Sequence, residues 1–495
     1  MLYWAIGFAL FVYLTLRSYF IPITHDEAGT FLEYVVVPLQ NTLLCIPASA
    51  TNHIFHTLLV KCSTGLFGNQ VFFIRLPVLL SYGLYFFFSL RLLQKLTTKP
   101  FWIVIGISFL NFHPYLLEFF SLSRGYGLGI AFMMGSIYYT FFYFNDYQSK
   151  KVIAALGFAA LASYSNFVFG FYYMSLVLLF VVHSVVLTHR VKSMKLWVKH
   201  DMVVQIVGGA SLVLALVTIV PLKNLLENKA FYIGGQTGFI ADTLGSLIRW
   251  NLYGVQYFGN FDLQIIAGVL LPILLAAFLW AIIGGFLYHK PKLTGDLYKR
   301  SEISLLQNLK ALQLFSALLV GVVGLQVLYV VLFEGKYAVG RTALYLLPLA
   351  MWLLFAFLWY GRRWLLVKTI AVFFAAMLTF HLLQTVNIRQ SYEWGFDADT
   401  PAMLDFMAQQ SSAQHKTLSL GVHWLMFPSV AYYRYVEGLP NVEVFSDKKL
   451  KPNEYNYYYI PEIEASDYLK NYAIVKRFGN GHILLLGIVK QKKSE

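Results

Sequence analysis

Long apolar runs alternate with short polar segments over the first 386 residues of the chain. A helix needs about 20 mostly apolar residues to cross a membrane. Eleven runs approach this length, at residues 2–21, 71–90, 101–117, 125–144, 152–165, 167–188, 202–221, 264–288, 311–333, 343–360 and 365–386. The run 152–165 is the shortest. The pattern predicts an all-α polytopic membrane domain over residues 1–386, with about eleven transmembrane helices and a range of 11 to 13.

The pattern changes after residue 386, where charged residues appear and long apolar runs stop. Short strand-like runs then alternate with helical ones. Strands are predicted at 417–422, 455–460 and 482–489, and a helix at 463–472. We therefore expect a small α/β domain over residues 387–495. No internal repeat is evident in the chain.

Two long segments, 22–70 and 222–263, separate predicted spans. Long loops in compact proteins are usually functional or disordered. The first is rich in aromatic residues and leucine, which favours an ordered loop. Within it, 53–67 is too short and too polar to span a membrane, so we expect an interfacial helix there.

Composition supports the membrane assignment. The chain is 58% hydrophobic and 13% charged, whereas soluble proteins carry about 25% charged residues. Its net charge of +14 fits cytoplasmic Lys and Arg facing anionic lipid headgroups. No nucleic-acid-binding motif is present, so we exclude nucleic acid as a partner and expect membrane lipids instead.

The distribution of Lys and Arg predicts the orientation. With the N-terminus in the cytoplasm, the inside loops carry 17 Lys and Arg and the longer outside loops carry 7. Cytoplasmic loops are enriched in these residues. The first apolar run has no preceding positive charge and no small-residue cleavage site, so we expect it to be a retained span. We predict a multi-pass protein of a bacterial inner membrane, with a periplasmic C-terminal domain.

An acidic cluster, His25-Asp26-Glu27, directly follows the first predicted span. Ionisable residues near membrane depth are costly and often functional. Asp26 could act as a general base that takes a proton from an incoming hydroxyl, assisted by Glu27. Alternatively, Asp26 could cap a helix that begins near Ala28. The residues alone leave these two interpretations equal.

A second polar group is formed by Asn52, His53 and His56. The two histidines share a helix face at this spacing, as metal ligands can, and His25 could join them. Two histidines are a weak metal signal, so we favour interfacial hydrogen bonding and predict no metal site. For Cys45 and Cys62, we favour two buried thiols over a disulfide.

Three arginines lie at the predicted outer face, although Lys and Arg are generally enriched in cytoplasmic loops. They are Arg75, Arg124 and Arg341. A guanidinium group presents a fixed fork of donors suited to phosphate. Each arginine could instead reach a lipid headgroup or pair with Glu118 or Glu334. Together, beside an acidic loop, they favour a phosphate-bearing substrate.

These features occur in an order that resembles the GT-C glycosyltransferases, in the branch of protein O-mannosyltransferases and the aminoarabinose transferase of lipid A. The resemblance covers roughly residues 1–390. In chain order, it is carried by Asp26-Glu27, Asn52-His53, Phe67-Gly68-Asn69, Arg75-Leu76-Pro77, Ser123-Arg124-Gly125-Tyr126-Gly127-Leu128, Arg341 and Leu347-Pro348. Residues 387–495 are similar in placement to the extracytoplasmic domain of many members.

The resemblance implies a sugar donor on a polyprenyl phosphate, with Asp26 as base and Glu27 at the second acidic position. It also implies phosphate contacts from Arg124 and Arg341. Further donor-binding candidates are Arg75, Asn52, His53 and Tyr126. Asn52-His53-Ile54 stands where many mannosyltransferases have His-Pro-Pro, so the sugar stays unassigned. Residues 1–390, which carry the resemblance, contain no Asp-x-Asp metal pair, and we expect no required cofactor.

The predicted activity is therefore glycosyl transfer to an acceptor hydroxyl on a lipid, glycan or protein. From the resemblance, we expect a direct displacement that inverts the anomeric centre. Two alternatives remain. A transporter or flippase of lipid-linked glycans should show broken helices at mid-bilayer in paired repeats, and a glycan polymerase would extend chains instead of adding single sugars.

Overall fold

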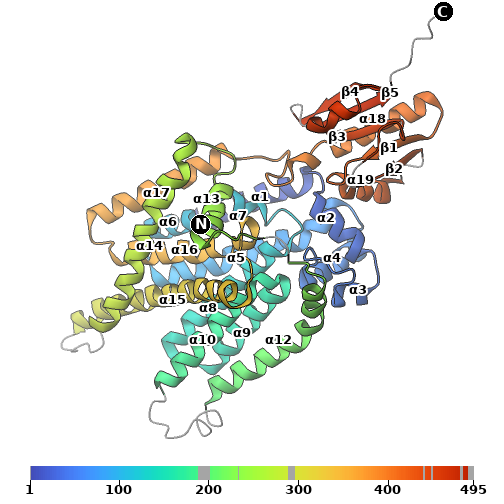
Figure 1. Ribbon diagram of the computed structural model, residues 1–495. Helices are drawn as coiled ribbons and strands as arrows, with labels where there is room; N and C mark the ends of the chain where they lie inside the picture. The colour runs from blue at the N-terminus through green and yellow to red at the C-terminus, as the bar shows by residue number, and fades with distance from the viewer. Residues whose placement is uncertain are drawn as a thin grey trace, which may run out of the picture. The chain divides into compact units, whose positions relative to one another are not determined.

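The computed structural model describes residues 2–187, 201–231, 234–287, 296–438, 441–447, 450–479 and 483–488. Helices make up most of these residues, and every described strand follows residue 417 (Figure 1). The predicted fold class, a helical polytopic protein with a small C-terminal α/β region, is confirmed. The segment 189–200, between the predicted spans 167–188 and 202–221, lies outside the described residues.

The chain forms two compact units, which we name the helical unit and the mixed unit. The helical unit comprises residues 1–14, 43–56 and 77–386. The mixed unit comprises residues 15–42, 57–76 and 387–495. The mixed unit therefore combines much of the first long loop with the C-terminal region.

Eight helices within the described residues are long and apolar enough to cross a membrane. They lie in α1 (Leu2–Phe20), α5 (Val71–Leu96), α8 (Gly125–Asp146), α10 (Gly170–Leu187), α12 (Met202–Glu227), α14 (Asp262–Leu287), α15 (Asp296–Phe333) and α17 (Leu365–Gln384). Eight of the eleven predicted spans correspond to them, and the total number of spans stays a prediction.

The other three predicted spans fall on shorter helices. These are α6 (Pro100–Asn111) with α7 (Pro114–Glu118), α9 (Ser149–Ser165) and α16 (Leu346–Tyr360). The expected single helix over 101–117 is wrong, because Pro114 begins a new helix. The preceding residue, His113, is extended (φ −118°, ψ 108°), as the ring of a following proline requires.

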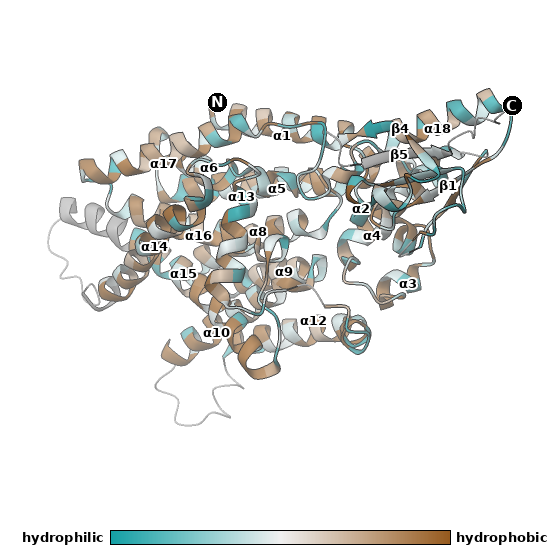
Figure 2. Cartoon of the chain, turned by 45° about the horizontal axis from the view of Figure 1, so that its top comes forward, coloured by the Kyte–Doolittle hydropathy of each residue, from teal (hydrophilic) through white to brown (hydrophobic). Residues whose placement is uncertain are grey.

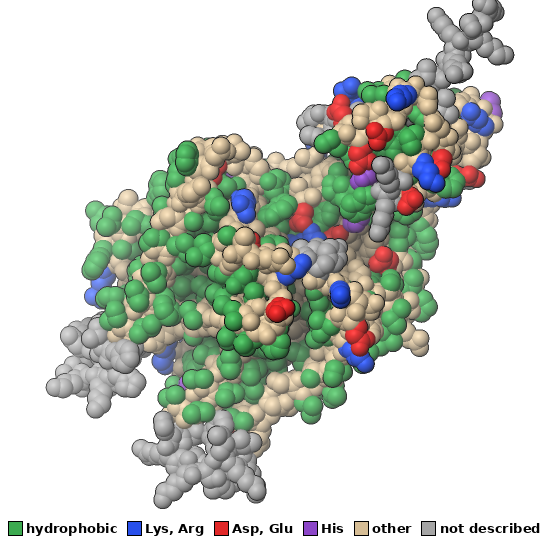
Figure 3. Space-filling view, viewed as in Figure 1, with side chains coloured by type: hydrophobic (Ala, Val, Ile, Leu, Met, Phe, Trp, Pro, Cys, Tyr) green, Lys and Arg blue, Asp and Glu red, His purple; other side chains and the backbone are tan. Residues whose placement is uncertain are grey.

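Several long helices expose their apolar side chains. Only 6% of the most apolar stretch of α12 is buried within the protein, whereas 72% of that of α8 is buried. Figure 2 shows α12, α14 and α17 as largely hydrophobic, and hydrophobic side chains cover much of the helical face in Figure 3. Exposed apolar surface of this extent needs a lipid surrounding.

The first long loop carries short helices. They are α2 (His25–Thr30), the π-helical turn η1 (Phe31–Val35), α3 (Leu39–Leu44) and α4 (Ile54–Phe67). The helix expected at 53–67 therefore exists as α4. The second long loop, 222–263, carries η3 (Phe239–Leu244), α13 (Gly245–Asn251) and η4 (Gly259–Phe261) in its described part.

The mixed unit contains a five-stranded sheet with the order β2-β1-β3-β5-β4. Its strands are β1 (Leu418–Val422), β2 (Val442–Phe445), β3 (Tyr457–Pro461), β4 (Tyr472–Phe478) and β5 (Ile483–Ile488). β1 pairs in parallel with β2 and β3, and β5 pairs antiparallel with β3 and β4. The three predicted strands correspond to β1, β3 and β5, although His482 and Val489 lie outside the described residues.

The helix predicted at 463–472 is wrong. A 3-10 turn (Glu462–Asp467) occupies its first half, and β4 begins at Tyr472. Ile463 is 89% exposed, whereas Ala465 and Tyr468 are buried. Buried side chains three residues apart fit a 3-10 turn, in which positions i and i+3 align. One short apolar edge does not sustain an amphipathic helix.

Helices α18 (Thr400–Gln414) and α19 (Phe427–Tyr433) complete the mixed unit, and residues from both ends of the sequence share its core. Phe31 packs edge-on against Tyr432, with ring centroids 5.2 Å apart. The Ile23 amide donates to the Tyr433 hydroxyl at 3.1 Å, and the Tyr432 hydroxyl donates to the Asn69 carbonyl at 2.5 Å. The acidic cluster near residue 26 therefore belongs to a core that the C-terminal region completes.

Candidate functional site

The acidic cluster lies on α2, and its N-cap is Thr24. The Thr24 amide donates to Glu27 Oε2 at 3.0 Å, and the Thr24 side chain accepts from the Glu27 amide, which together form a capping box. The Thr24 hydroxyl also lies 3.0 Å from Glu27 Oε2. The helix thus begins at His25, and Asp26 lies in its first turn. The alternative that Asp26 caps a helix beginning near Ala28 is wrong, since Thr24 and Glu27 supply the cap.

Glu27 is also held by Arg75. Arg75 Nε donates to Glu27 Oε1 at 2.8 Å, and Nη2 donates to Oε2 at 2.6 Å. Both side chains are fully buried. A two-point guanidinium–carboxylate pair combines charge with fixed geometry. Both carboxylate oxygens of Glu27 are therefore used inside the protein.

The remaining N–H groups of Arg75 bind main-chain carbonyls. Nη1 contacts the carbonyls of Ser18 and Ile21 at 3.3 and 2.6 Å, and Nη2 contacts that of Pro22 at 2.8 Å. An arginine side chain has five N–H donors. The three contacts with main-chain carbonyls and the two with Glu27 together use all five. Arg75 therefore has a structural role that joins the end of α1 to Glu27, and its donors are not available to a phosphate.

Asp26 is 7% exposed, and the Thr30 hydroxyl donates to its carbonyl at 2.8 Å. A further acid, Asp397, belongs to the same unit and was missed by sequence reasoning. Asp397 ends the 3-10 turn Gly395–Asp397, and its Oδ2 accepts from the His25 amide at 2.6 Å. Burial, with the negative charges of Glu27 and Asp26, raises the pKa of Asp397 well above its usual value.

His25 contacts the loop before α19. Its Nδ1 lies 2.7 Å from the Leu425 carbonyl, and its ring meets Trp424 edge-on. Across the described residues, His, Cys, Asp and Glu side chains do not converge in groups of three or more that could hold a metal. His25 therefore serves as a link between α2 and the segment before α19.

In the helical unit, a second group of predicted residues gathers around His53. The ring of His53 meets that of Tyr126 edge-on, with centroids 5.2 Å apart. Burial lowers the pKa of His53 well below its usual value, and the charges of Arg124, His56 and Arg341 lower it further. His53 is thus neutral and lies in a region of positive potential.

Arg124 is 1% exposed and is the N-cap residue of α8. Its Nη1 donates to the Thr51 carbonyl at 3.4 Å, and the neighbouring Ser123 hydroxyl lies 3.5 Å from His56 Nε2. Arg124 and Arg341 both act electrostatically on His53, and an anion bound beside His53 would be attracted by both cations. Arg124, Arg341 and His56 thus lie within electrostatic range of His53, whose ring contacts Tyr126; their role in binding a phosphate stays a prediction.

Two glycines permit close packing at the start of α8. A Cβ on Gly125 would lie 2.1 Å from the Ser165 carbonyl oxygen and 2.7 Å from His53 Cβ. A Cβ on Gly127 would lie 2.1 Å from the Phe119 carbonyl oxygen. The glycines on both sides of Tyr126 therefore let the start of α8 approach His53, which explains the Arg-Gly-Tyr-Gly sequence in physical terms.

Arg341 lies on the 3-10 turn Gly340–Ala343. Gly340 has φ +54°, a conformation that favours glycine, and its amide donates to the Ser246 hydroxyl of α13 at 2.9 Å. A Cβ on Gly340 would also lie 2.9 Å from Trp250 Nε1. Part of the second long loop thus positions the turn that carries Arg341.

Asn52 is buried, and its amide donates to Cys45 Sγ at 3.2 Å. Burial raises the pKa of the Cys45 thiol to about 11, although this hydrogen bond opposes the rise. Both cysteines are free thiols, Cys45 buried and Cys62 exposed. The expectation of two buried thiols is therefore right for Cys45 and wrong for Cys62.

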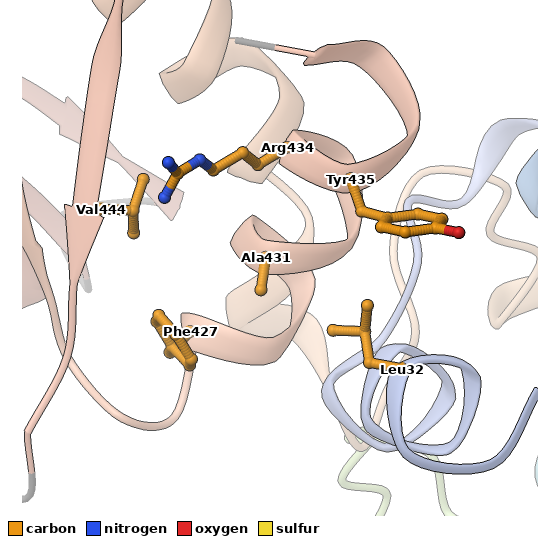
Figure 4. Close-up of a pocket in the computed structure, with 6 residues that line it drawn as sticks. All are labelled: Leu32, Phe427, Ala431, Arg434, Tyr435 and Val444. Carbon is orange, nitrogen blue, oxygen red and sulfur yellow. The ribbon is translucent and has the colours of Figure 1, made fainter. Parts of the chain in front are cut away.

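A groove of about 350 Å³ lies in the mixed unit, apart from these residues (Figure 4). It is lined by Leu32, Phe427, Ala431, Arg434, Tyr435 and Val444. Two π-helical turns, η1 and η7 (Arg434–Gly438), contribute to its walls. The groove is mainly apolar, and none of the predicted site residues lines it.

No protein-family model and no curated protein matches the sequence. Among solved structures, ArnT from Cupriavidus metallidurans is similar in its apo state, with 11% identity and a TM-score of 0.42 over 99% of this chain and 97% of that one. The same protein bound to undecaprenyl phosphate is also similar, with 12% identity and a TM-score of 0.40 over 99% of this chain and 98% of that one.

Proposed function

We propose that this chain is an integral-membrane glycosyltransferase of the GT-C type. It transfers a sugar from a polyprenyl-phosphate donor to an acceptor hydroxyl at the extracytoplasmic face, and it requires no cofactor. The observation that carries the proposal is the packing of His53 against Tyr126 at the start of α8, directly after the buried Arg124, within electrostatic range of both Arg124 and Arg341. These cations suit a phosphate that gains charge as it leaves the sugar.

The reaction needs one base and one site for the leaving group. The acceptor oxygen attacks the anomeric carbon, and the bond from that carbon to the phosphate oxygen breaks. The acceptor proton passes to Asp26, and the polyprenyl phosphate leaves as an anion stabilised by Arg124 and Arg341. A direct displacement of this kind inverts the anomeric centre.

The Glu27 carboxylate is committed to structural contacts. Both oxygens of Glu27 are occupied by Arg75 and Thr24. With the helix cap supplied by Thr24 and Glu27, α2 does not need the Asp26 carboxylate as a cap. We therefore assign the base to Asp26 and a supporting role to Glu27.

Replacing Asp26 tests the base. Asp26→Asn keeps the size of the side chain and removes its basicity, so sugar transfer in membranes should fall by about 10²–10⁴-fold while donor binding persists. Glu33→Gln is the matched control, because Glu33 is an exposed acid two turns further on. Full activity of a folded Asp26→Asn protein would refute the assignment.

Replacing the arginines tests the phosphate site. Arg124→Gln and Arg341→Gln should each weaken the binding of polyprenyl phosphate, whereas Lys223→Gln removes an exposed cation and should leave binding unchanged. Equal binding by all three variants would contradict the site. Lipid movement without sugar transfer in reconstituted vesicles would favour a transporter instead.

We also propose that the loop 22–70 faces the periplasm of a bacterium and the N-terminus faces the cytoplasm. Cys62 lies in this loop with an exposed thiol, whereas Cys45 is buried. A maleimide that does not cross membranes should therefore label wild-type protein, but not Cys62→Ser, in cells whose inner membrane is intact. Labelling of Cys62 only after the inner membrane is broken would show that the loop 22–70 faces the cytoplasm, and the proposed orientation would be wrong.

A further inference from the structure

The carboxyl group of Asp397 connects the acidic helix α2 with α19. It is 1% exposed. Its Oδ2 accepts from the His25 amide at 2.6 Å, and its Oδ1 lies 2.6 Å from the Ser429 hydroxyl. His25 forms a second link, because its Nδ1 lies 2.7 Å from the Leu425 carbonyl. The first residue of α2 is thus held through both its main chain and its side chain.

The hydrogen count around Ser429 indicates the state of Asp397. The Ser429 hydroxyl has one hydrogen, and it lies 2.8 Å from the Met426 carbonyl as well as 2.6 Å from Asp397 Oδ1. The carbonyl can only accept, and it also receives the Val430 amide at 3.2 Å. The Thr400 hydroxyl lies 3.4 Å from Ser429 Oγ. A chain in which Asp397 donates to Ser429 and Ser429 donates to Met426 makes both short contacts of Ser429 hydrogen bonds. This chain requires a protonated Asp397.

The surrounding charges favour the same state. Asp26 and Glu27 of α2 face Asp397 and raise its pKa, as does burial, and Tyr459 of β3 also lies within electrostatic range. Arg75 is committed to Glu27. A third negative charge at this place would repel Asp26 and Glu27, whereas a neutral acid binds the His25 amide without that repulsion.

We propose that Asp397 is a positioning residue, whose neutral carboxyl group fastens the first turn of α2 to α19 and so holds Asp26 in its working orientation. α2 and the π-helical turn η1 that continues it span only residues 25–35, and a helix this short is marginal alone. The amide that Asp397 binds is one of those that a helix leaves unsatisfied at its start. The effect on catalysis rests on the function proposed above, whereas the effect on α2 does not.

Three variants test the proposal in the full-length protein. Asp397→Asn keeps an acceptor for His25 and a donor for Ser429, Asp397→Ala removes both, and Asp405→Ala removes an exposed acid of the neighbouring helix α18 as the matched control. Hydrogen exchange, read by mass spectrometry in detergent, reports on residues 22–30. Steady-state kinetics reports kcat and KM separately.

We expect Asp397→Ala to speed exchange in residues 22–30 at least tenfold, and to lower kcat at least tenfold with KM for the donor within about twofold. Asp397→Asn and Asp405→Ala should match the wild type in both. If Asp397→Ala does not fold, Ser429→Ala should still speed exchange in residues 22–30 in a folded protein, because it removes the partner of the acid.

Unchanged exchange in Asp397→Ala, or in a folded Ser429→Ala, would overturn the proposal. So would an Asp397→Asn protein as defective as Asp397→Ala, since that result would require a charged carboxylate. A wild-type protein without transferase activity would refute the proposed function instead. The exchange results would then still decide whether Asp397 holds α2.

Discussion

The buried pair between Arg75 and Glu27 makes a quantitative prediction about stability. Glu27→Gln keeps the shape of the side chain but leaves the Arg75 cation buried without its counter-ion. Removing one partner of a buried pair costs about 3–5 kcal/mol. Because the pair is fully buried, water does not screen this loss as it would at the surface.

The expected change in melting temperature is large. At about 2–4 °C per kcal/mol for a unit of roughly 150–250 residues, Glu27→Gln should lower the apparent Tm by about 6–20 °C. Arg75→Met should lower it by a similar amount, because it leaves the carboxylate unpaired. The double variant should lose less than the sum of both losses, since neither charge is then left alone.

The measurement is thermal unfolding in detergent, followed by a fluorescent thiol dye or by tryptophan emission. Glu462→Gln is the control, because Glu462 and Arg477 form an exposed pair at 3.0 Å in the same unit. An exposed pair contributes about 0–1 kcal/mol, so this variant should melt close to the wild type. A Glu27→Gln protein that also melts close to the wild type, but transfers no sugar, would refute the structural role of Glu27.

Two further predictions concern the helical unit. Gly125→Ala would place a Cβ 2.1 Å from the Ser165 carbonyl oxygen. This variant should destabilise the protein by about 1–3 kcal/mol or more, measured as a lower Tm. The control is Gly157→Ala, whose Cβ would meet nothing within 4 Å and which should be neutral or stabilising. The lowered pKa of His53 means that the unfolded chain binds a proton more readily than the folded chain below about pH 6.5. Stability should thus fall as the pH falls from about 6.5, and this dependence of Tm on pH should be weaker in His53→Gln.

Sequence patterns predicted the long helices well because their signal is local. α12 and α14 are continuous apolar runs, and no tertiary contact is needed to recognise them. The helix predictions were wrong where a single residue or a narrow buried edge decides the backbone conformation. Pro114 divides the helix expected at 101–117, and the single buried edge at Ala465 and Tyr468 supports a 3-10 turn instead of a helix.

The candidate site was predictable only in part. The acidic pair and the arginines stand out because charge is rare in a membrane chain. The partners of these residues could not be predicted, because they lie far away in the sequence: Glu27 pairs with Arg75 across 48 residues, and the His25 amide donates to Asp397 across 372. A sequence without its fold cannot distinguish an arginine that binds substrate from one whose five donors are used internally. Asp397 carried one available signal, the pair Asp397-Ala398-Asp399 in the segment that follows the last predicted span.

The two neighbouring carboxylates of α2 acquire different roles because of what surrounds each one. Glu27 is neutralised by Arg75 and closes the helix cap, so it fixes where α2 begins. Asp397 and Leu425 then fix how α2 meets α19, since His25 binds both. Asp26 stands between these anchors on a helix too short to hold its own orientation. The chemistry proposed for Asp26 therefore depends on residues 372 and 400 positions after His25 in the chain, which belong to the same compact unit.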